Sequence, residues 1–379
     1  MSLDFGKLRR WPDVEAENLQ AVDAADRLLL DVAGAAGWPP EPGRVAILGD
    51  HYGALALGAL DAGVRGLRVH QDALSGARAT DANAARLLPG LAGEYRQLGL
   101  GGELLAGASL VLVQLPRSLD ALEEMLGFVA GHAGPEVTVM AAGRIKHMSL
   151  SMNEVLGRYF TSVTASLGRQ KSRVLTATGL RPAAQLPAPR FPLQSSHDLG
   201  LPEPLQLRAH AQTFGGAKLD PGTRFLLAHL EVPRDAGHAV DLGCGNGTIA
   251  AFLAVSHPQL SVHASDQSAS AVASTRATAA ANGVAERITA VQDDALASLP
   301  AASESFVVLN PPFHMGNTVH AGIALKLIAD AGRVLAPGGE LWCVWNSHLG
   351  YRGQLEKLVG PTRQVARNPK FTVTVSTRA

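Results

Sequence analysis

The chain has 379 residues, of which 46% are hydrophobic and 17% charged, and its 33 basic and 33 acidic side chains give a formal net charge of zero. This length suffices for two domains with packed cores, and the composition argues against disorder. No apolar run approaches the roughly 20 residues that cross a bilayer, no signal peptide is recognisable, and Cys244 and Cys343 are too few for a disulfide framework or a four-ligand zinc site. We therefore expect a soluble cytoplasmic protein with no membrane segment and no metal.

The first part of the chain alternates between strand-like and helix-like patterns. A predicted strand and glycine-containing turn at 45–53, Val-Ala-Ile-Leu-Gly-Asp-His-Tyr-Gly, lead into an apolar helix. A second strand ends near Asp72, a third apolar run occupies 110–117, and a further strand ends the pattern at 137–142. Strands that alternate with helices in this way predict a doubly wound α/β domain with a mainly parallel sheet.

Positive charge is concentrated late in this part of the chain. Residues 137–195 contain eight Lys and Arg but one acid, Glu154, whereas residues 1–136 contain 11 Lys and Arg and 18 acids. A basic segment in a neutral protein can neutralise phosphates locally. A solvated surface without a partner explains the same pattern, and both interpretations stay open.

A proline-rich stretch separates this part from the next. Six prolines fall between 182 and 204, and proline fixes φ and removes a hydrogen-bond donor. We predict a first domain at 1–190, an extended linker at 191–205 and a second domain at 206–379.

The second domain repeats the pattern of the first. Residues 239–251 again read as strand, glycine turn and apolar helix, a second strand ends at Asp266, and further strands are predicted at 288–291, 306–309 and 339–345. The sequence thus predicts two tandem, doubly wound Rossmann-like domains. The chemistry-bearing residues are present in the second copy alone, so the first is the degenerate one.

The glycine turn of the second copy is a predicted cofactor site. It contains Asp241, Gly243, Gly245, Asn246 and Gly247. Glycines permit a tight turn and close approach of a ligand to the backbone. An acid before the first glycine is unsuited to a pyrophosphate but suits the cationic aminopropyl arm of S-adenosylmethionine.

Acids after the next two strands extend this predicted site. Asp266, with Gln267 beside it, is placed to accept hydrogen bonds from ribose hydroxyls, and Asp294 is placed to meet the adenine amino group. Each acid alone would also suit a helix N-cap. Three acids at successive strand ends favour a binding site for S-adenosylmethionine.

Asn310-Pro311-Pro312-Phe313 follows the fourth strand and is the predicted catalytic segment. The Asn310 side-chain oxygen and the Pro311 carbonyl could each accept one N–H of a planar amine, which would orient its lone pair toward a methyl donor. Pro312 stiffens the loop, and Phe313 offers a flat face for a base. His314 contacts the base or caps the next helix.

These motifs resemble those of the class I methyltransferases that modify exocyclic amines. Asn-Pro-Pro-Phe-His together with a degenerate tandem copy is similar to the ribosomal RNA guanine-N2 methyltransferases, and the chain length and the segments at 24–26 and 49–55 lean toward the large-subunit (23S) branch. The resemblance covers nearly the whole chain. It implies methylation of guanine N2 with S-adenosylmethionine as cofactor and ribosomal RNA or a ribosomal subunit as partner. Gly215-Gly216 departs from the Ser-Arg pair usual in the segment before the second domain.

Within this interpretation the basic segment gains a role. A target base must leave its helix to reach the strand ends, and the rest of the RNA needs another surface. We expect Arg169, Lys171 and Arg173 to contact phosphates, with the basic C-terminal segment around 352–370 as the alternative.

Other functions share the motif. The related Asn-Pro-Pro-Tyr class methylates adenine in DNA or a glutamine amide in proteins, and a small-subunit guanine methyltransferase would share the whole design. A non-enzymatic RNA-binding assembly protein is a further alternative, which the intact second copy argues against. The sequence leaves the oligomeric state, the modified nucleotide and the form of the RNA substrate open.

Overall fold

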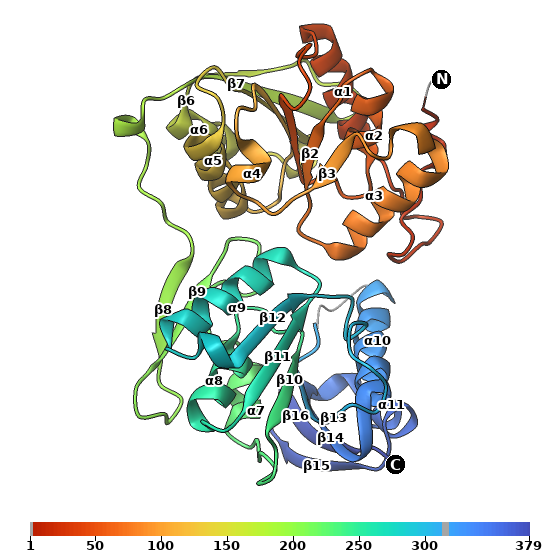
Figure 1. Ribbon diagram of the computed structural model, residues 1–379, viewed down its shortest axis with the longest axis vertical. Coiled ribbons are helices and arrows are strands. Elements are labelled where there is room, and N and C mark those ends of the chain that lie inside the picture. Colours follow the sequence, from red (N-terminus) through yellow and green to blue (C-terminus); the bar gives the residue numbers. More distant parts are fainter. Residues whose placement is uncertain (1–2, 313–317) are drawn as a thin grey trace. The chain divides into compact units, whose positions relative to one another are not determined.

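The computed structural model describes residues 3–312 and 318–379, and the chain divides into two compact units, Met1–Arg190 and Phe191–Ala379 (Figure 1). The structure differs from the expected linker at 191–205. Strand β8 (Leu193–His197) lies within it and pairs in antiparallel fashion with β9 (Leu205–Ala209) of the second unit. The alternate side chains Leu205, Leu207 and Ala209 are buried, so a period-two apolar pattern outweighs the proline content here.

The N-terminal unit is built on a seven-stranded sheet within the described residues. Its strands stand in the order β3-β2-β1-β4-β5-β7-β6. The first five strands are parallel, and β7 and β6 close the sheet as an antiparallel pair. The strands are β1 (Val45–Leu48), β2 (Leu67–His70), β3 (Tyr95–Gln97), β4 (Leu110–Gln114), β5 (Thr138–Arg144), β6 (Phe160–Ala165) and β7 (Ser172–Leu180).

The C-terminal unit repeats this topology. Its main sheet, again seven-stranded in the described part, has the order β12-β11-β10-β13-β14-β16-β15, with the last two strands antiparallel. Equal strand order and equal strand direction confirm the predicted duplication. The strands are β10 (His238–Leu242), β11 (Ser261–Asp266), β12 (Ile288–Gln292), β13 (Glu304–Leu309), β14 (Leu335–Asn346), β15 (Thr362–Arg367) and β16 (Phe371–Thr377).

Helices cover both faces of each sheet. In the N-terminal unit α1 (Ala24–Ala36), α2 (Ala54–Asp61) and α3 (Leu74–Leu87) cover one face, and α4 (Gly102–Leu105), α5 (Leu119–His132) and α6 (Leu150–Tyr159) cover the other. In the C-terminal unit α7 (Pro221–Leu227), α8 (Thr248–Ser256) and α9 (Ala269–Ala281) lie opposite α10 (Thr318–Val334) and α11 (Arg352–Leu358). Short 3-10 turns are η1 (Phe5–Lys7), η2 (Pro89–Leu91), η3 (Ile145–His147), η4 (Ala183–Gln185), η5 (Ala285–Arg287) and η6 (Ser347–Leu349).

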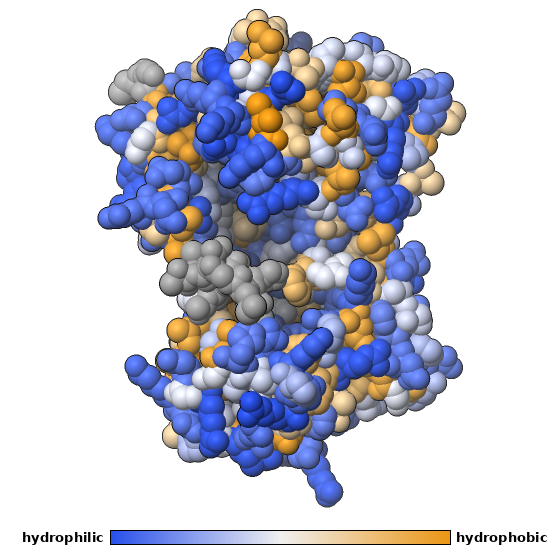
Figure 2. Space-filling model, turned by 180° about the vertical axis from the view of Figure 1, so that it is seen from behind, coloured by the Kyte–Doolittle hydropathy of each residue, from blue (hydrophilic) through white to orange (hydrophobic). Residues whose placement is uncertain are grey.

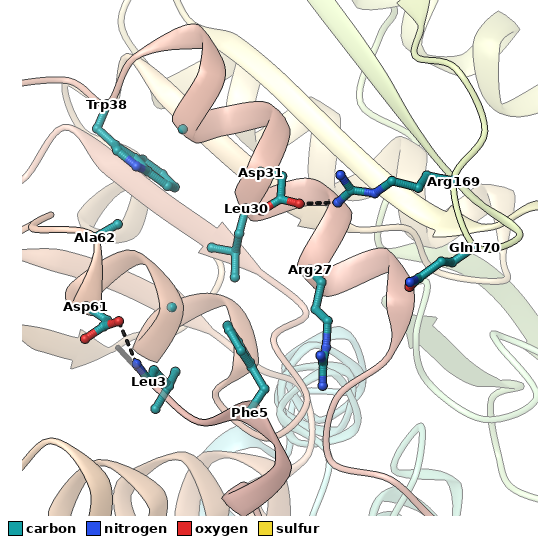
Figure 3. Close-up of a pocket in the computed structure, with 12 residues that line it drawn as sticks. Leu3, Phe5, Arg27, Leu30, Asp31, Trp38, Asp61, Ala62, Arg169 and Gln170 are labelled. Atoms are coloured by element: carbon teal, nitrogen blue, oxygen red, sulfur yellow. Dashed lines mark hydrogen bonds and ion pairs between the residues drawn. The ribbon is translucent and has the colours of Figure 1, made fainter. Parts of the chain in front are cut away.

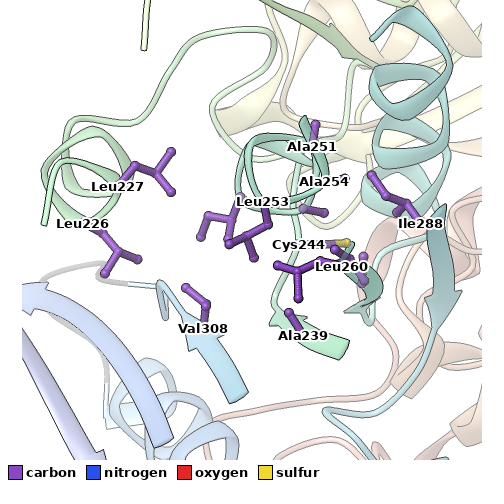
Figure 4. Close-up of a cluster of buried hydrophobic side chains, with 14 of the residues drawn as sticks. Leu226, Leu227, Ala239, Cys244, Ala251, Leu253, Ala254, Leu260, Ile288 and Val308 are labelled. Atoms are coloured by element: carbon purple, nitrogen blue, oxygen red, sulfur yellow. The ribbon is translucent and has the colours of Figure 1, made fainter. Parts of the chain in front are cut away.

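The central parallel strands β1 and β4 are almost entirely apolar because both of their faces are buried. In β13, Val308 packs toward α8, whereas its neighbours Val307 and Leu309 pack toward α10. Figure 4 shows Val308 among the side chains of α7, α8 and β10 in the larger core of this unit. On the face seen in Figure 2, hydrophilic side chains cover most of the surface and hydrophobic ones form small separate groups. No helix of the described ranges is long and apolar enough to cross a membrane.

Strand pairing corrects one detail of the predicted repeat. Leu48 pairs with His70, and Leu242 pairs with Ser265, so the residue after His70 is the counterpart of Asp266. That residue is Gln71, whereas the sequence pattern suggested Asp72. Spacing along the chain could not settle this one-residue difference, because the register is set by the neighbouring strand.

Candidate active site

The glycine turn between β10 and α8 requires its glycines. Gly243, Gly245 and Gly247 have φ values of 76°, 55° and 78°, a region that side chains with a Cβ rarely adopt. A Cβ built on Gly243 or Gly245 would meet no atom within 4 Å, so open space borders the turn. A Cβ on Gly247 would lie 2.8 Å from the Cα of Thr275, so this glycine also permits α8 and α9 to approach.

Asp241 lies at the end of β10 below this turn and is fully buried. Its Oδ2 accepts the N–H of Ala250 at 2.9 Å, and its Oδ1 has no partner among the described residues. Burial raises its pKa to about 7, and the nearby charge of Asp266 acts in the same direction. A buried carboxyl without a counter-charge would be stabilised by a cationic group, so Asp241 fits the amino group of S-adenosylmethionine.

Asp266 at the end of β11 anchors the glycine turn. Its Oδ2 accepts the N–H of Gly245 at 3.0 Å, and its Oδ1 accepts the N–H of Ser268 at 2.9 Å. Because each carboxylate oxygen can accept more than one hydrogen bond, ribose hydroxyls can still be accommodated. Gln267 follows it with an exposed side chain.

The side chain of Asn246 in the glycine turn forms hydrogen bonds within the protein. Its Nδ2 donates to the carbonyls of Gly216 and Lys218 at 2.9 and 3.2 Å, and its Oδ1 accepts from the hydroxyl of Thr248 at 2.6 Å. All the donors of this side chain are thus used to tie the segment before the second sheet to the glycine turn. Gly215 also lies in this segment, and it and Gly216 both have positive φ values, 74° and 58°, which explains glycines at these two positions.

Asp294 lies after β12 and forms an ion pair with Lys326 of α10. Its neighbour Asp293 is 5% exposed, and the Asp293 N–H donates to the Asp266 carbonyl at 2.9 Å. The ends of β11 and β12 are therefore joined at this edge of the sheet. Asp293 also caps the following turn, because it accepts the N–H of Ser298 at 2.7 Å.

Asn310 follows β13 at the same edge, next to the glycine turn, because Leu309 pairs with Leu242. Its Nδ2 donates to Asp220 Oδ2 at 3.0 Å and to Thr223 Oγ1 at 2.8 Å. A carboxylate can only accept, so these contacts determine which way the amide faces. The Asn310 Oδ1 consequently points away from α7, and no described residue donates to it.

Sequence reasoning missed Asp220 and Thr223 as positioning residues. Asp220 is the N-cap of α7, where it accepts the Thr223 N–H at 2.8 Å, and Pro221 stands at the first helical position. The Asp-Pro-Gly-Thr pattern is a recognisable helix start, but its contact with Asn310 spans about 90 residues of sequence.

The rest of the predicted catalytic segment is described in part. Pro311 is buried and Pro312 is half-buried. Phe313 and His314 lie outside the described residues. Asp241, Gly243, Gly245, Gly247, Asp266 and Asn310 nevertheless meet at one edge of the sheet, where ligands bind in doubly wound folds.

The corresponding glycine turn of the N-terminal unit is packed more closely against protein atoms. The counterpart of Gly245 is His51, and the counterpart of Asp266 is Gln71, whose Nε2 donates to Thr80 Oγ1 at 2.7 Å. A Cβ on Gly49 would lie 3.3 Å from the Gln114 carbonyl, whereas the equivalent Gly243 faces open space. This copy lacks a carboxylate at the place of Asp266, and its turn is less open.

The predicted RNA-contacting residues lie on the β6–β7 hairpin of the N-terminal unit. Arg169 forms an ion pair with Asp31 of α1, at the edge of a cavity of about 550 Å³ (Figure 3). Lys171 and Arg173 are exposed, and no acidic partner is found for either within the described residues. The charge of Arg169 is therefore partly neutralised by Asp31, whereas Lys171 and Arg173 have no such partner among the described residues.

In residues 3–312 and 318–379 no group of three or more His, Cys, Asp or Glu side chains is placed to hold a metal ion. Both cysteines are buried, and burial raises the pKa of Cys244 and Cys343.

Comparisons with known proteins agree with this arrangement. A model of the methyltransferase small domain matches residues 204–375, and a model of the RLMG N-terminal domain matches residues 2–181. The solved structure of a T. thermophilus 16S rRNA N2 G1207 methyltransferase, in complex with AdoMet and guanosine, is similar over 94% of this chain and 92% of its own. Its TM-score of 0.72 at 21% identity supports the shared two-domain fold.

Curated relatives extend over nearly the full length. Ribosomal RNA large subunit methyltransferase G of Pseudomonas paraeruginosa is 39% identical over 97% of this chain and 96% of its own. The protein of the same name from Streptomyces coelicolor is 35% identical over the same shares of the two chains. The chain therefore belongs to the ribosomal RNA large subunit methyltransferase G family.

Proposed function

We propose that this chain transfers the methyl group of S-adenosylmethionine to the exocyclic N2 amine of a guanine in large-subunit ribosomal RNA. The observation that carries the proposal is the orientation of Asn310. Both of its N–H bonds are used by Asp220 and Thr223, so the oxygen Oδ1 is the atom presented to a substrate. An oxygen presented in this way suits an amine, which donates.

The chain's own residues suit the cofactor. The Gly243–Gly247 turn offers backbone atoms and open space, Asp266, with Gln267 beside it, suits ribose hydroxyls, Asp241 suits the amino group, and we assign Asp294 to the adenine amino group. When bound, S-adenosylmethionine supplies an electrophilic methyl group. The side chain of Asn246 contributes indirectly, since it holds the 213–218 segment against the turn.

The substrate amine is held by two acceptors. Asn310 Oδ1 accepts one N–H of the guanine amine, and the Pro311 carbonyl accepts the other. Holding both protons in the plane of the base directs nitrogen lone-pair density toward the methyl group, and positioning of this kind contributes several kcal/mol. A stacking role for Phe313 remains a prediction from the sequence.

The N-terminal unit serves a different purpose in this proposal. Its glycine turn is less open and its Asn-Pro-Pro-Phe is replaced by Gln114-Leu-Pro-Arg117, so it does not transfer methyl groups. We assign it to RNA binding, through a surface that includes Lys171 and Arg173.

The test is nucleoside mapping. Large-subunit ribosomal RNA, small-subunit ribosomal RNA and a protein extract are incubated separately with the protein and isotope-labelled S-adenosylmethionine, digested and analysed by mass spectrometry. The expected product is N2-methylguanosine at one position, absent with Asn310→Ala. Label on adenine, on small-subunit RNA alone or on a protein glutamine would contradict the proposal.

A further inference from the structure

The two amine acceptors of the proposed site do not by themselves select guanine. Asn310 Oδ1 and the Pro311 carbonyl can accept the N–H bonds of any planar amine, so the rest of the base must be recognised by another group. On guanine the amine is followed by N1–H, which donates, and by O6, which accepts. A side chain that recognises this edge needs an acceptor and a donor next to each other, and an amide has both.

Asn346 is the last residue of β14, the strand beside β13. Leu309, where β13 ends, pairs with Cys343, so β14 continues for three residues beyond the end of its neighbour. At about 3.3 Å per residue this extension is about 10 Å long. Asn346 therefore flanks the Asn310–Pro312 segment at the edge of the sheet where the amine is held.

Both amides lie on the same face of the sheet. In β14, Val344 packs toward α7 and α8, whereas Trp345 packs toward α10 and α11. Because side chains alternate along a strand, Asn346 returns to the α7 face. Asn310 belongs to that face too, since it donates to Asp220 at the start of α7.

Phe371 places Asn346 next to the first turn of α7. The two residues pair across β14 and β16, and a Cβ on Gly222 of α7 would lie 3.2 Å from the Phe371 ring. The same Cβ would lie 3.0 Å from Asp220 Oδ2, which is the atom that accepts from Asn310. Asn346 thus neighbours the residues that orient the catalytic amide.

The backbone after Asn346 is held by hydrogen bonds, whereas the side chain of Asn346 is not. The Ser347 N–H donates to the Lys370 carbonyl at 2.8 Å, and its hydroxyl donates to the Asn368 carbonyl at 3.2 Å and shares a hydrogen bond with Thr372 Oγ1 at 2.9 Å. Asn346 stands at the N-cap of η6 without capping it, and no described residue bonds to its half-buried amide. A donor and an acceptor presented from a fixed backbone suit the recognition of a ligand.

The N-terminal copy has no amide at this place. Val113 pairs with Ala141 as Leu309 pairs with Cys343, so Arg144 is the counterpart of Asn346. A guanidinium donates but cannot accept, and it is therefore unable to recognise N1–H. The fold does not require an amide here, and the copy that has one is the copy with the catalytic segment.

We propose that Asn346 recognises the N1–H and O6 edge of the target guanine, which rests on the proposed function. With the base amine on Asn310 and Pro311, Asn346 Oδ1 accepts N1–H and Asn346 Nδ2 donates to O6. An adenine whose amine is held in the same way presents an acceptor and a C–H along this edge, so one of the two hydrogen bonds is lost. A polar atom left without its partner weakens binding of the wrong base.

The experiment uses 2-aminopurine, which has the same exocyclic amine as guanine but lacks N1–H and O6. Large-subunit ribosomal RNA is prepared by ligation with guanine or 2-aminopurine at the position that nucleoside mapping identifies, and kcat/KM for methyl transfer is measured with the full-length protein. The wild type should prefer guanine by about tenfold or more, as expected for a contact of two hydrogen bonds. Asn346→Ala should lose about tenfold on guanine and change little on 2-aminopurine, so the ratio of the two values should approach one.

Ser347→Ala is the matched control, because its hydroxyl is bonded within the protein, and it should keep the wild-type ratio. Asn346→Leu, which is similar in size to asparagine, replaces Asn346→Ala if that variant does not fold. The role of Asn346 is overturned if its replacement keeps the wild-type ratio or lowers both values of kcat/KM equally. A wild-type protein that methylates neither RNA would instead contradict the proposed function, so the two failures are distinguishable.

Discussion

Asn310 in the C-terminal unit and Gln114 in the N-terminal unit occupy the same place in their sheets, and each donates to the start of the helix that precedes the first strand of its sheet. Asn310 donates to Asp220 and Thr223 at the start of α7, and Gln114 donates to Asp26 at the start of α1. The N-terminal copy has this contact although Leu115 and Arg117 stand there in place of Pro311 and Phe313. The contact therefore stabilises the fold in both copies, and in the C-terminal copy it also orients the amide.

Replacing Asn310 by Ala should reduce methyl transfer without weakening cofactor binding. Its Oδ1 engages the amine mainly as the new bond forms, so we expect kcat to fall by the equivalent of about 2–4 kcal/mol. Single-turnover methylation and calorimetric titration with S-adenosylmethionine measure the two quantities. A wild-type kcat would remove Asn310 from the mechanism.

Asp220→Asn tests orientation separately from helix capping. Asparagine caps helices about as well as aspartate, so stability should change little. The variant side chain can donate as well as accept, so it no longer requires the Asn310 amide to face one way. We expect a lower kcat at an unchanged melting temperature. Thr223→Val, which removes the second acceptor, should act in the same direction, and an unaltered rate in both variants would contradict the positioning role.

Cofactor binding should occur in the C-terminal unit alone. Calorimetry of the full-length chain should give one site, and Asp266→Ala should weaken that site by removing the ribose acceptor and the anchor of the Gly245 N–H. The effect should fall mainly on the cofactor KM, with less on kcat. Gln71→Ala, the same truncation in the N-terminal copy, is the control and should leave the affinity as it was. A second saturable site would show that the less open turn still binds.

The buried carboxyl of Asp241 should make the C-terminal unit less stable as the pH rises. Its pKa is about 7 in the folded chain, against an ordinary value of 3.8, so the native state holds this proton more tightly than the unfolded state. The resulting contribution to the free energy of unfolding is complete below about pH 4 and is lost as the pH rises through about 7. Urea unfolding between these limits should show that decline, and Asp241→Asn should flatten it. An equal slope in the variant would assign the decline to other groups, such as the buried Asp50 of the N-terminal unit, whose pKa is about 6.

Two glycines of the turn should differ in their tolerance of alanine. The Cβ added by Gly243→Ala would meet open space, so the expected loss of stability is that of a non-glycine residue in the left-handed region, about 1–2 kcal/mol. Gly247→Ala carries the same cost and also brings a Cβ to 2.8 Å from the Cα of Thr275, so it should destabilise the unit more, by about 1–3 kcal/mol beyond the first variant. If thermal unfolding shows that both variants lose the same stability, α9 can move away from the added Cβ at no cost in free energy.

The sequence by itself determined the features that local chemistry dictates. Apolar runs such as 306–309, glycine turns and helix starts are legible because burial on two faces, positive φ and capping each restrict the residues at a position. Repetition of these signals predicted the tandem fold, and the Asn310 segment predicted the chemistry.

Tertiary structure decided what depends on which segments meet. The register of β2 against β1 made Gln71 the counterpart of Asp266, the pairing of β8 with β9 placed 191–205 in the second unit, and contacts across about 90 residues joined Asn310 to Asp220. Likewise the charges of Arg117, after β4, and Arg144, at the end of β5, both act on His147 because β4 and β5 are neighbours. Periodicity encodes which face of an element is buried, but partners across a sheet are chosen by packing of the whole unit.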